Sequence, residues 1–188
     1  MTDLPTVDDL LQQARAALAN NLAELDAYQY AQLPDSRDEA LTTLIAGYRA
    51  LGSPADREAL ARSLSGWQRG TLSSYFNRMA MVAVRTRSIE TLSGAAVALA
   101  ISQYDSDPRE LLMNLPLLCR ASELLDAGVE PYLQAAADAP SLAVAAVFRS
   151  EAASFSSGCG RLPAMLREVQ GPNGIIWINA KHPIPAGW

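Results

Sequence analysis

The segment from Thr91 to Gln103 contains no charged residue, and this feature most restricts how the chain can fold. A helix that is apolar around most of its circumference has to be covered by other elements on most sides. The uncharged run is also too short to span a membrane, which takes about 20 predominantly apolar residues. We therefore predict that this segment forms a buried helix at the centre of the fold.

A second helical pattern precedes the uncharged segment. Between residues 71 and 85, apolar side chains recur on one helical stripe: Leu72, Phe76, Met79, Ala80 and Ala83. Ser88 is placed to cap a new helix that begins at Ile89. Because only a short break after Arg87 separates them, the two helices are predicted to form an antiparallel hairpin.

The remainder of the chain is also predicted to be helical. A hydrophobic content of 49% with only 6% aromatic residues indicates a core built mainly from leucine, alanine and valine. Start and stop signals predict about eight or nine helices in an all-α fold. They cover approximately residues 7–28, 36–51, 54–64, 71–85, 89–103, 108–125, 131–138, 141–155 and 163–169.

The C-terminal end has a different composition. The sequence Gly171-Pro172-Asn173-Gly174 is a strong turn signal, and residues 175–178 form the only segment predicted to be a strand. We therefore divide the chain into one helical domain, residues 1–170, and a non-helical tail, residues 171–188. The apolar weight of the tail predicts that it docks on the body or on a partner, and a homodimer formed through the tail is one alternative.

Three predicted helix pairs recur along the chain, at residues 37–64, 71–103 and 108–138. Their period of roughly 35 to 40 residues resembles the spacing of HEAT-like helical repeats. The resemblance concerns spacing over about 100 residues and implies a stack of helical hairpins. A compact orthogonal bundle gives the same pattern, so both architectures stay open. Pro116 is expected to kink or split the helix in the third pair.

Positive charge is concentrated in one stretch. Residues 61–89 contain five arginines and no acidic residue, although the whole chain has a net charge of −5. The candidate partner-binding residues, which we call the arginine band, are Arg69, Ser74, Arg78, Arg85 and Arg87. Such a band could dock an acidic protein segment or a phosphate group.

The alternative for the arginine band is internal pairing. The acidic N-terminal region supplies candidate partners, which are Asp35, Asp38, Glu39, Asp56 and Glu58. Nucleic acid is disfavoured as a partner, because the net charge is negative and few aromatic residues are interleaved with the arginines.

No set of residues in the sequence predicts a catalytic or metal centre. His182 is the single histidine, and neither a dinucleotide-binding nor a phosphate-binding glycine motif occurs, so no cofactor is predicted. The only two cysteines, Cys119 and Cys159, have no metal-binding or redox-motif spacing, which favours a reducing compartment over a disulfide framework. Cys159 lies between two glycines and beside Arg161, and it is a weak candidate for a reactive thiol.

These observations favour a non-enzymatic helical scaffold that binds another protein. The first residues show no basic region followed by an apolar stretch, so a cytoplasmic location is predicted. The alternative function is an enzyme or small-molecule binder with an inter-helical pocket, with Cys159, Arg161 or Tyr75 at its mouth.

Overall fold

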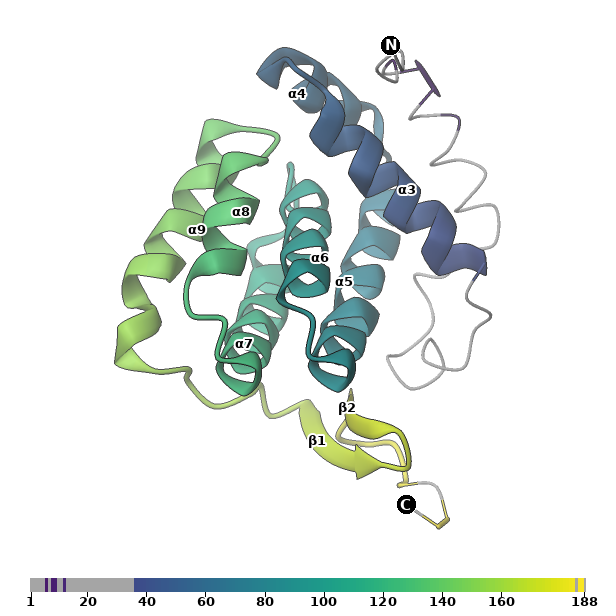
Figure 1. Cartoon of the computed structure of the whole chain (residues 1–188), viewed down its shortest axis with the longest axis vertical. Helices are drawn as coiled ribbons and strands as arrows, with labels where there is room; N and C mark the ends of the chain where they lie inside the picture. Colours follow the sequence, from purple (N-terminus) through teal and green to yellow (C-terminus); the bar gives the residue numbers. More distant parts are fainter. Residues whose placement is uncertain (1–5, 7, 10–11, 13–35, 185, 188) are drawn as a thin grey trace.

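The structure, a computed structural model, describes Thr6, Asp8, Asp9, Gln12, residues 36–184 and residues 186–187. In this part of the chain, seven α-helices are followed by a two-stranded antiparallel sheet (Figure 1). The helices are α3 (Ser36–Ala50), α4 (Pro54–Ser63), α5 (Gly66–Thr86), α6 (Ile89–Ser102), α7 (Pro108–Leu125), α8 (Glu130–Ala137) and α9 (Leu142–Ser154). A short 3-10 helix, η1 (Phe155–Ser157), leads to β1 (Leu166–Gly171) and β2 (Gly174–Asn179). The mostly helical fold predicted from the sequence is confirmed.

Helices begin at the capping residues that the sequence indicates. The Ser53 side chain accepts a hydrogen bond from a backbone N–H at 3.2 Å at the start of α4. Ser88 does the same at 3.1 Å for α6, and Asp107 at 2.9 Å for α7. Pro54 and Pro108 occupy the first turn of their helices, where a missing N–H leaves no bond unmade. Local sequence therefore sets most helix starts.

Helix α6 lies at the centre of the fold, as its lack of charge predicts (Figure 1). Its neighbours are α3, α5, α7, α8 and α9. Ala96, Val97, Ala98 and Leu99 are fully buried. Small side chains allow neighbouring helices to approach α6 closely, while leucine and valine fill the remaining space.

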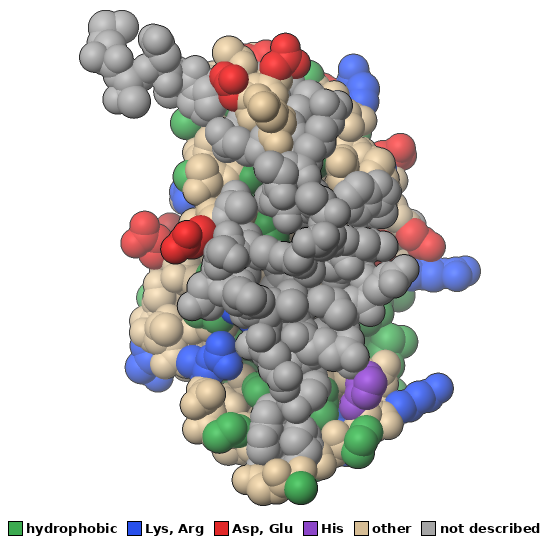
Figure 2. Space-filling model, turned by 90° about the vertical axis from the view of Figure 1, so that its right-hand side faces the viewer, with side chains coloured by type: hydrophobic (Ala, Val, Ile, Leu, Met, Phe, Trp, Pro, Cys, Tyr) green, Lys and Arg blue, Asp and Glu red, His purple; other side chains and the backbone are tan. Residues whose placement is uncertain are grey.

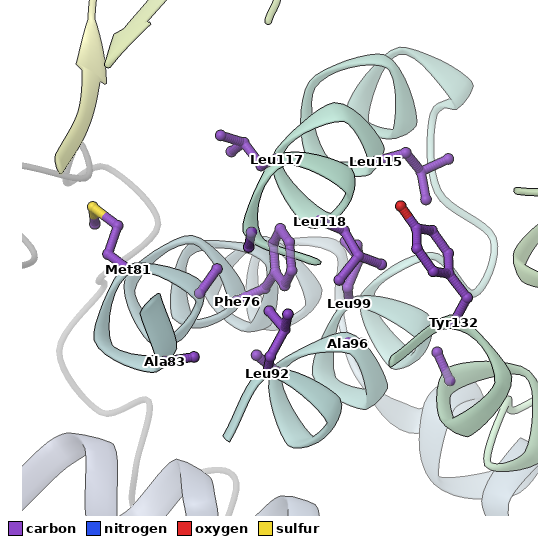
Figure 3. Packing of buried hydrophobic residues seen from close by; sticks show 14 of the residues in the cluster. Phe76, Met81, Ala83, Leu92, Ala96, Leu99, Leu115, Leu117, Leu118 and Tyr132 are labelled. Carbon is purple, nitrogen blue, oxygen red and sulfur yellow. The ribbon is translucent and has the colours of Figure 1, made fainter. Parts of the chain in front are cut away.

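The buried side chains form two clusters on either side of the α5–α6 hairpin. The larger one joins α5 and α6 to α7, α8 and the sheet, and Figure 3 shows Phe76, Leu99, Leu118 and Tyr132 pointing toward one another within it. The second joins α5 and α6 to α3 and α4 and includes Leu41, Tyr48, Leu60 and Val97. The hairpin therefore holds the two halves of the bundle together.

The arrangement around α6 favours a compact bundle over a linear stack. In a helical solenoid each repeat contacts only its neighbours. Here α6 contacts α3 on one side and α8 and α9 on the other, so elements distant in sequence share one core. Pro116 does not split α7, which continues from Pro108 to Leu125.

The strand predicted at residues 175–178 is confirmed as part of β2, but the helical turn predicted at residues 163–169 is wrong. Residues 166–169 belong to β1, which pairs with β2 so that Glu168 lies opposite Trp177. Pairing with a strand that packs on the core overrides the weak local helical preference, because strand formation depends on context. Two of the nine predicted helices are therefore not among the seven that the structure describes. One is replaced by β1, and the other, residues 7–28, lies almost entirely outside the described residues.

Gly174 at the start of β2 has to be a glycine for two reasons. Its φ of +114° is a conformation that side chains rarely allow. A Cβ atom there would lie 2.6 Å from Cγ of Arg85, whose stem packs against the turn. The β-hairpin is therefore seated directly on the end of α5.

The first predicted helix, residues 7–28, falls almost entirely outside the described residues. Its predicted cap is present, because the Thr6 hydroxyl accepts a hydrogen bond from the Asp9 N–H at 3.2 Å and donates one to the Asp9 carboxylate at 2.7 Å. Within the described residues, no helix combines the length and the apolar character needed to cross a membrane.

Candidate functional site

A cleft of about 670 Å³ opens where the end of α4 and the start of α5 face α7, α9 and the connection between α6 and α7. Its volume falls within the range of roughly 300–1,000 Å³ that is typical of small-molecule sites. Six of its lining residues are apolar: Leu64, Leu111, Ala143, Val144, Val147 and Phe148. The other six, which we call the polar rim, are Arg62, Arg69, Gln103, Tyr104, Asp105 and Ser141.

Most of the apolar lining comes from α9, and we call these α9 residues the apolar wall. Ala143 and Val147 lie four residues apart and therefore follow one another along a single face of this helix. Phe148 is fully buried and anchors α9 in the core. The wall is therefore held by a packed helix, and a ligand of matching shape would not have to order it.

Arg62, one of the residues that line the cleft, is engaged by neighbouring side chains. Its guanidinium lies 2.6 Å from Oε1 of Glu58, one turn earlier on α4. Its Nε donates to the Tyr104 hydroxyl at 3.3 Å, and that hydroxyl in turn lies 3.3 Å from Glu58 Oε1. The three groups form a closed triangle in which the charge of Arg62 is already balanced.

Arg69 is engaged by backbone carbonyl groups. One terminal nitrogen donates to the carbonyl oxygen of Leu64 and lies 3.4 Å from that of Ala61. These carbonyls belong to the end of α4, where the last residues of a helix lack partners within the helix. Arg69 therefore completes the end of α4 as well as lining the cleft.

Gln103 follows α6 directly and is only 8% exposed, although it forms part of the cleft wall. Its Nε2 donates to the Ser102 hydroxyl at 3.1 Å, and this hydroxyl donates to the Leu99 carbonyl at 2.7 Å. Because Ser102 has used its single hydrogen, it can only accept from Gln103, which fixes the orientation of the amide. The amide oxygen, Oε1, has no hydrogen-bond partner among the described residues.

Asp105 also lines the cleft and is exposed. Its φ of +56° lies in the left-handed region, which aspartate and asparagine tolerate better than most residues. Within the described part of the chain, its carboxylate makes no hydrogen bond or ion pair. The tight connection between α6 and α7 thus presents a carboxylate to the cleft.

The residues of the predicted arginine band do not form one exposed surface. Arg69 lines the cleft, and Arg78 is only 5% exposed. Arg85 packs against the β-hairpin, and its burial, followed by repulsion from Arg78, lowers the pKa of its guanidinium. Ser74 donates to the Gly70 carbonyl at 3.2 Å within its own helix. Arg87 is exposed at the end of α5.

The sequence interpretation of the two cysteines is wrong. Cys119 in α7 and Cys159 after η1 form a disulfide, with their Cα atoms 5.6 Å apart. Cys159 is therefore not a free reactive thiol. The pairing could not be read from spacing, because it depends on how the loop after η1 returns to α7.

The predicted pocket near Cys159 and Arg161 corresponds to a small hollow of about 120 Å³. Both cysteines line it, together with Pro116, Tyr132 and Phe155, whereas Arg161 is exposed elsewhere. The third residue proposed for the mouth, Tyr75, is buried and lines a different hollow of about 250 Å³ between α3, α5 and α6. The structure does not bring these three residues together.

Sequence reasoning did not single out the cleft, and its residues carry no motif. Arg62 comes from α4, Gln103 and Asp105 come from the connection between α6 and α7, and Ala143 and Val147 come from α9. A cleft built from several segments leaves no spacing pattern in the sequence. The cleft exists only because the folded chain brings α9 and the α6–α7 connection to the same place.

Comparisons of the chain with protein-family models, with curated proteins and with solved structures found no match.

On the face shown in Figure 2, the acidic side chains of the described residues lie mainly in the upper half and the basic ones mainly in the lower half. No group of three or more His, Cys, Asp or Glu side chains in the described ranges could hold a metal ion. The fold and the cleft define a helical bundle with a ligand-sized cavity that has both apolar and polar lining residues.

Proposed function

We propose that this protein binds a small molecule that has an apolar body, in the cleft between α4, α5, α7 and α9. The observation that carries the proposal is the lining of the cleft, which combines an apolar wall on α9 with polar side chains from other elements. Burial of apolar surface gives roughly 25 cal/mol per Å², so the wall supplies the main driving force for binding. The polar rim would then orient the ligand.

This proposal keeps a binding role, but of the arginine band only Arg69 lines the cleft. The burial of Arg78 and the packing of Arg85 on the β-hairpin count against a shared docking surface for an acidic protein segment. Docking of such a segment at Arg87 stays a prediction. The inter-helical pocket, which was the alternative, is supported at a different place from the one predicted.

Filling the cleft is expected to weaken ligand binding. Ala143 lines the cleft on α9, whereas Ala146 lies on the same helix, is exposed and is not among the cleft residues. Tryptophan at position 143 occupies space next to the apolar wall, whereas tryptophan at position 146 points elsewhere. Binding of the apolar reporter N-phenyl-1-naphthylamine, followed by its fluorescence, should weaken at least about tenfold in Ala143→Trp. It should be unchanged in Ala146→Trp.

Two results would contradict the proposal. If the reporter does not bind the unmodified protein, the cleft is not a site for apolar molecules. If Ala143→Trp and Ala146→Trp bind the reporter equally well, the binding surface lies elsewhere. Circular dichroism of both variants provides the check that each has kept its helices.

We also propose that the protein works in an oxidising compartment rather than in the predicted cytoplasm. The support is the disulfide between the only two cysteines of the sequence, since such bonds are rare in reducing compartments. The bond ties α7 to the segment that leads to the β-hairpin, and Glu123 strengthens this junction by accepting from the Cys159 N–H at 3.2 Å.

The compartment can be tested by labelling thiols in intact cells that make the protein. Both cysteines should resist alkylation at first and react only after a reductant has been added, which mass spectrometry of the tryptic peptides would show. Alkylation of Cys119 and Cys159 without reductant would contradict the proposed compartment. A protein sample denatured without reductant serves as the control for simple inaccessibility.

A further inference from the structure

Helices α7 and α9 both line the cleft, yet they make little direct contact with each other. Leu111 of α7 and Val144 of α9 are among the lining residues. Within the described part of the chain, α7 packs mainly on α5 and α6, whereas α9 packs mainly on α8 and α6. The separation of α7 and α9, and with it the width of the cleft, therefore depends on whatever else connects these two helices.

The same faces of α7 and α9 also border the small hollow beside the disulfide. On α7, Leu111 lines the cleft, and Leu115 and Cys119 line the hollow at successive intervals of four residues. On α9, Phe148 lines the cleft, and Glu151 lines the hollow three residues later. Residues three or four apart lie on one face of a helix. The cleft and the hollow therefore follow one another between these two faces, which we call the α7–α9 seam.

The disulfide closes the α7–α9 seam at the end away from the cleft. Cys119 lies eight residues after Leu111, which is about 12 Å along α7 at a rise of 1.5 Å per residue. Cys159 follows α9 and η1 after a single residue, Gly158. The bond therefore ties the end of the helix that carries the apolar wall to α7. Without it, only noncovalent contacts would hold this junction, such as the hydrogen bond from the Cys159 N–H to the exposed Glu123.

The surroundings of the disulfide leave room for an attacking thiol. Both cysteines are half-buried and line the hollow, whereas Gly158 and Gly160, on either side of Cys159, are exposed. A Cβ atom at either glycine would meet no atom within 4 Å apart from its chain neighbours. Thiol–disulfide exchange begins when a thiolate attacks one of the two sulfur atoms. Attack on Cys159 would release Cys119 as the leaving thiolate.

We propose that the redox state of the Cys119–Cys159 disulfide controls the affinity of the cleft. A dithiol reductant supplies two electrons and two protons, so that the S–S bond breaks into two thiols and the reductant becomes a disulfide. The end of α9 is then released from α7, the seam widens, and an apolar ligand loses contact with the wall. The inference rests on the proposed function, because it concerns the regulation of the same cleft. The form that binds ligand is the oxidised one, which the proposed compartment favours.

Binding of N-phenyl-1-naphthylamine to the oxidised and the reduced protein tests the inference. Reduction by dithiothreitol should weaken binding at least about fivefold, the lower end of typical couplings between two sites. Removal of the dithiothreitol and reoxidation by oxidised glutathione should restore the affinity.

Two variants assign the effect to the disulfide. The double variant Cys119→Ser/Cys159→Ser should bind the reporter as weakly as the reduced protein and should not respond to dithiothreitol. Ser157→Ala is the matched control, because it changes an exposed residue of the same segment and keeps both cysteines. It should respond to dithiothreitol as the unmodified protein does.

Hydrogen exchange followed by mass spectrometry shows whether reduction acts locally. Amides of residues 149–165 should exchange faster in the reduced protein, because this segment is no longer tied to α7. Amides of α3 and α4 should be unchanged, since these helices belong to the other core cluster. Faster exchange in all seven helices would show that the bond stabilises the whole fold rather than the seam, and the inference would be wrong.

The outcomes separate this inference from the proposed function. If the reporter binds the oxidised and the reduced protein equally well, the cleft remains a site but its redox control is overturned. The same conclusion holds if the double variant binds as tightly as the unmodified protein. If the reporter does not bind even the oxidised protein, the proposed function fails, and the inference fails with it.

Discussion

Trp177→Ala should lower the free energy of unfolding by roughly 3–5 kcal/mol, the usual loss for a large aromatic residue removed from a core. Trp177 lies in β2, is 1% exposed and belongs to the larger core cluster. Truncation removes its buried apolar area and leaves a cavity between the sheet and α5. The effect is expected to be the largest of any single change in the C-terminal segment.

Polar contacts around Trp177 add to this loss. Its indole N–H donates to the Glu168 carboxylate at 2.8 Å, and Arg120 of α7 approaches the same carboxylate at 3.3 Å. Burial alone would raise the pKa of the Glu168 carboxyl, but the hydrogen bonds from Arg120 and Trp177 outweigh it and hold this pKa below its usual value. The β-hairpin is thus attached to both α5 and α7.

Urea denaturation followed by circular dichroism would measure the loss. Ile184→Ala is the matched control, because this apolar residue of the same segment is 48% exposed, and its effect should stay within about 0.5 kcal/mol. Equal losses for the two variants would show that Trp177 is not part of the core.

The same samples test the homodimer alternative. If the tail packs on its own chain, the melting temperature should not depend on protein concentration, whereas a tail exchanged between two copies makes it rise with concentration. Melting curves over about a hundredfold concentration range would decide between the two. A rise in the unmodified protein that is lost in Trp177→Ala would show that the tail completes a neighbouring chain.

Asp138→Asn is expected to lower the free energy of unfolding by roughly 2–3 kcal/mol, because it leaves two partly buried arginines without the charge that balances them. Asp138 follows α8 and lies 3.0 Å from Nε of Arg49 and 3.4 Å from a terminal nitrogen of Arg57. Its side chain is 11% exposed, so water compensates little for the lost charge. The contact joins α8 to α3 and α4, across the two halves of the bundle.

Neighbouring groups show that the Asp138 junction is built from several interactions. The Tyr48 hydroxyl donates to the Asp138 carbonyl at 2.6 Å, and Gln134 donates to its carboxylate at 2.7 Å. The guanidinium of Arg57 lies 5.9 Å from the centre of the Tyr48 ring, and burial raises the pKa of that tyrosine above its ordinary value. Removing one charge therefore disturbs a connected network.

Asp126→Asn provides the control for Asp138→Asn. Asp126 also follows a helix, α7, but it is exposed and has a left-handed φ of +55° that asparagine tolerates. Denaturation of the two variants in parallel should show a loss only at position 138. A loss below about 0.5 kcal/mol there would mean that the ion pairs contribute no more than those on a protein surface.

Much of the helical structure could be predicted from the sequence. Ser53, Ser88 and Asp107 cap helices where their side chains indicate, because a cap requires only groups a few residues apart. The burial of α6 also follows from its composition, since a helix without charge has no face suited to water. These conclusions rest on local geometry or on hydrophobicity alone.

The candidate site could not be predicted in the same way. Arg78 reads as an exposed cation on a helix, yet the packing of α5 buries it. Cys119 and Cys159 read as unrelated cysteines, yet the path of the chain after α9 brings them together. In each case the outcome depends on which segments meet in space.

The sequence by itself determined the helical character of the chain, its capping residues and the buried position of α6. Only the tertiary structure decided the cleft, the disulfide and the conversion of residues 166–171 into a strand. The physical reason is the separation along the chain of the residues that interact. Helix formation and capping depend on residues within about one turn, whereas cavities, disulfides and strand pairing join residues far apart in the chain.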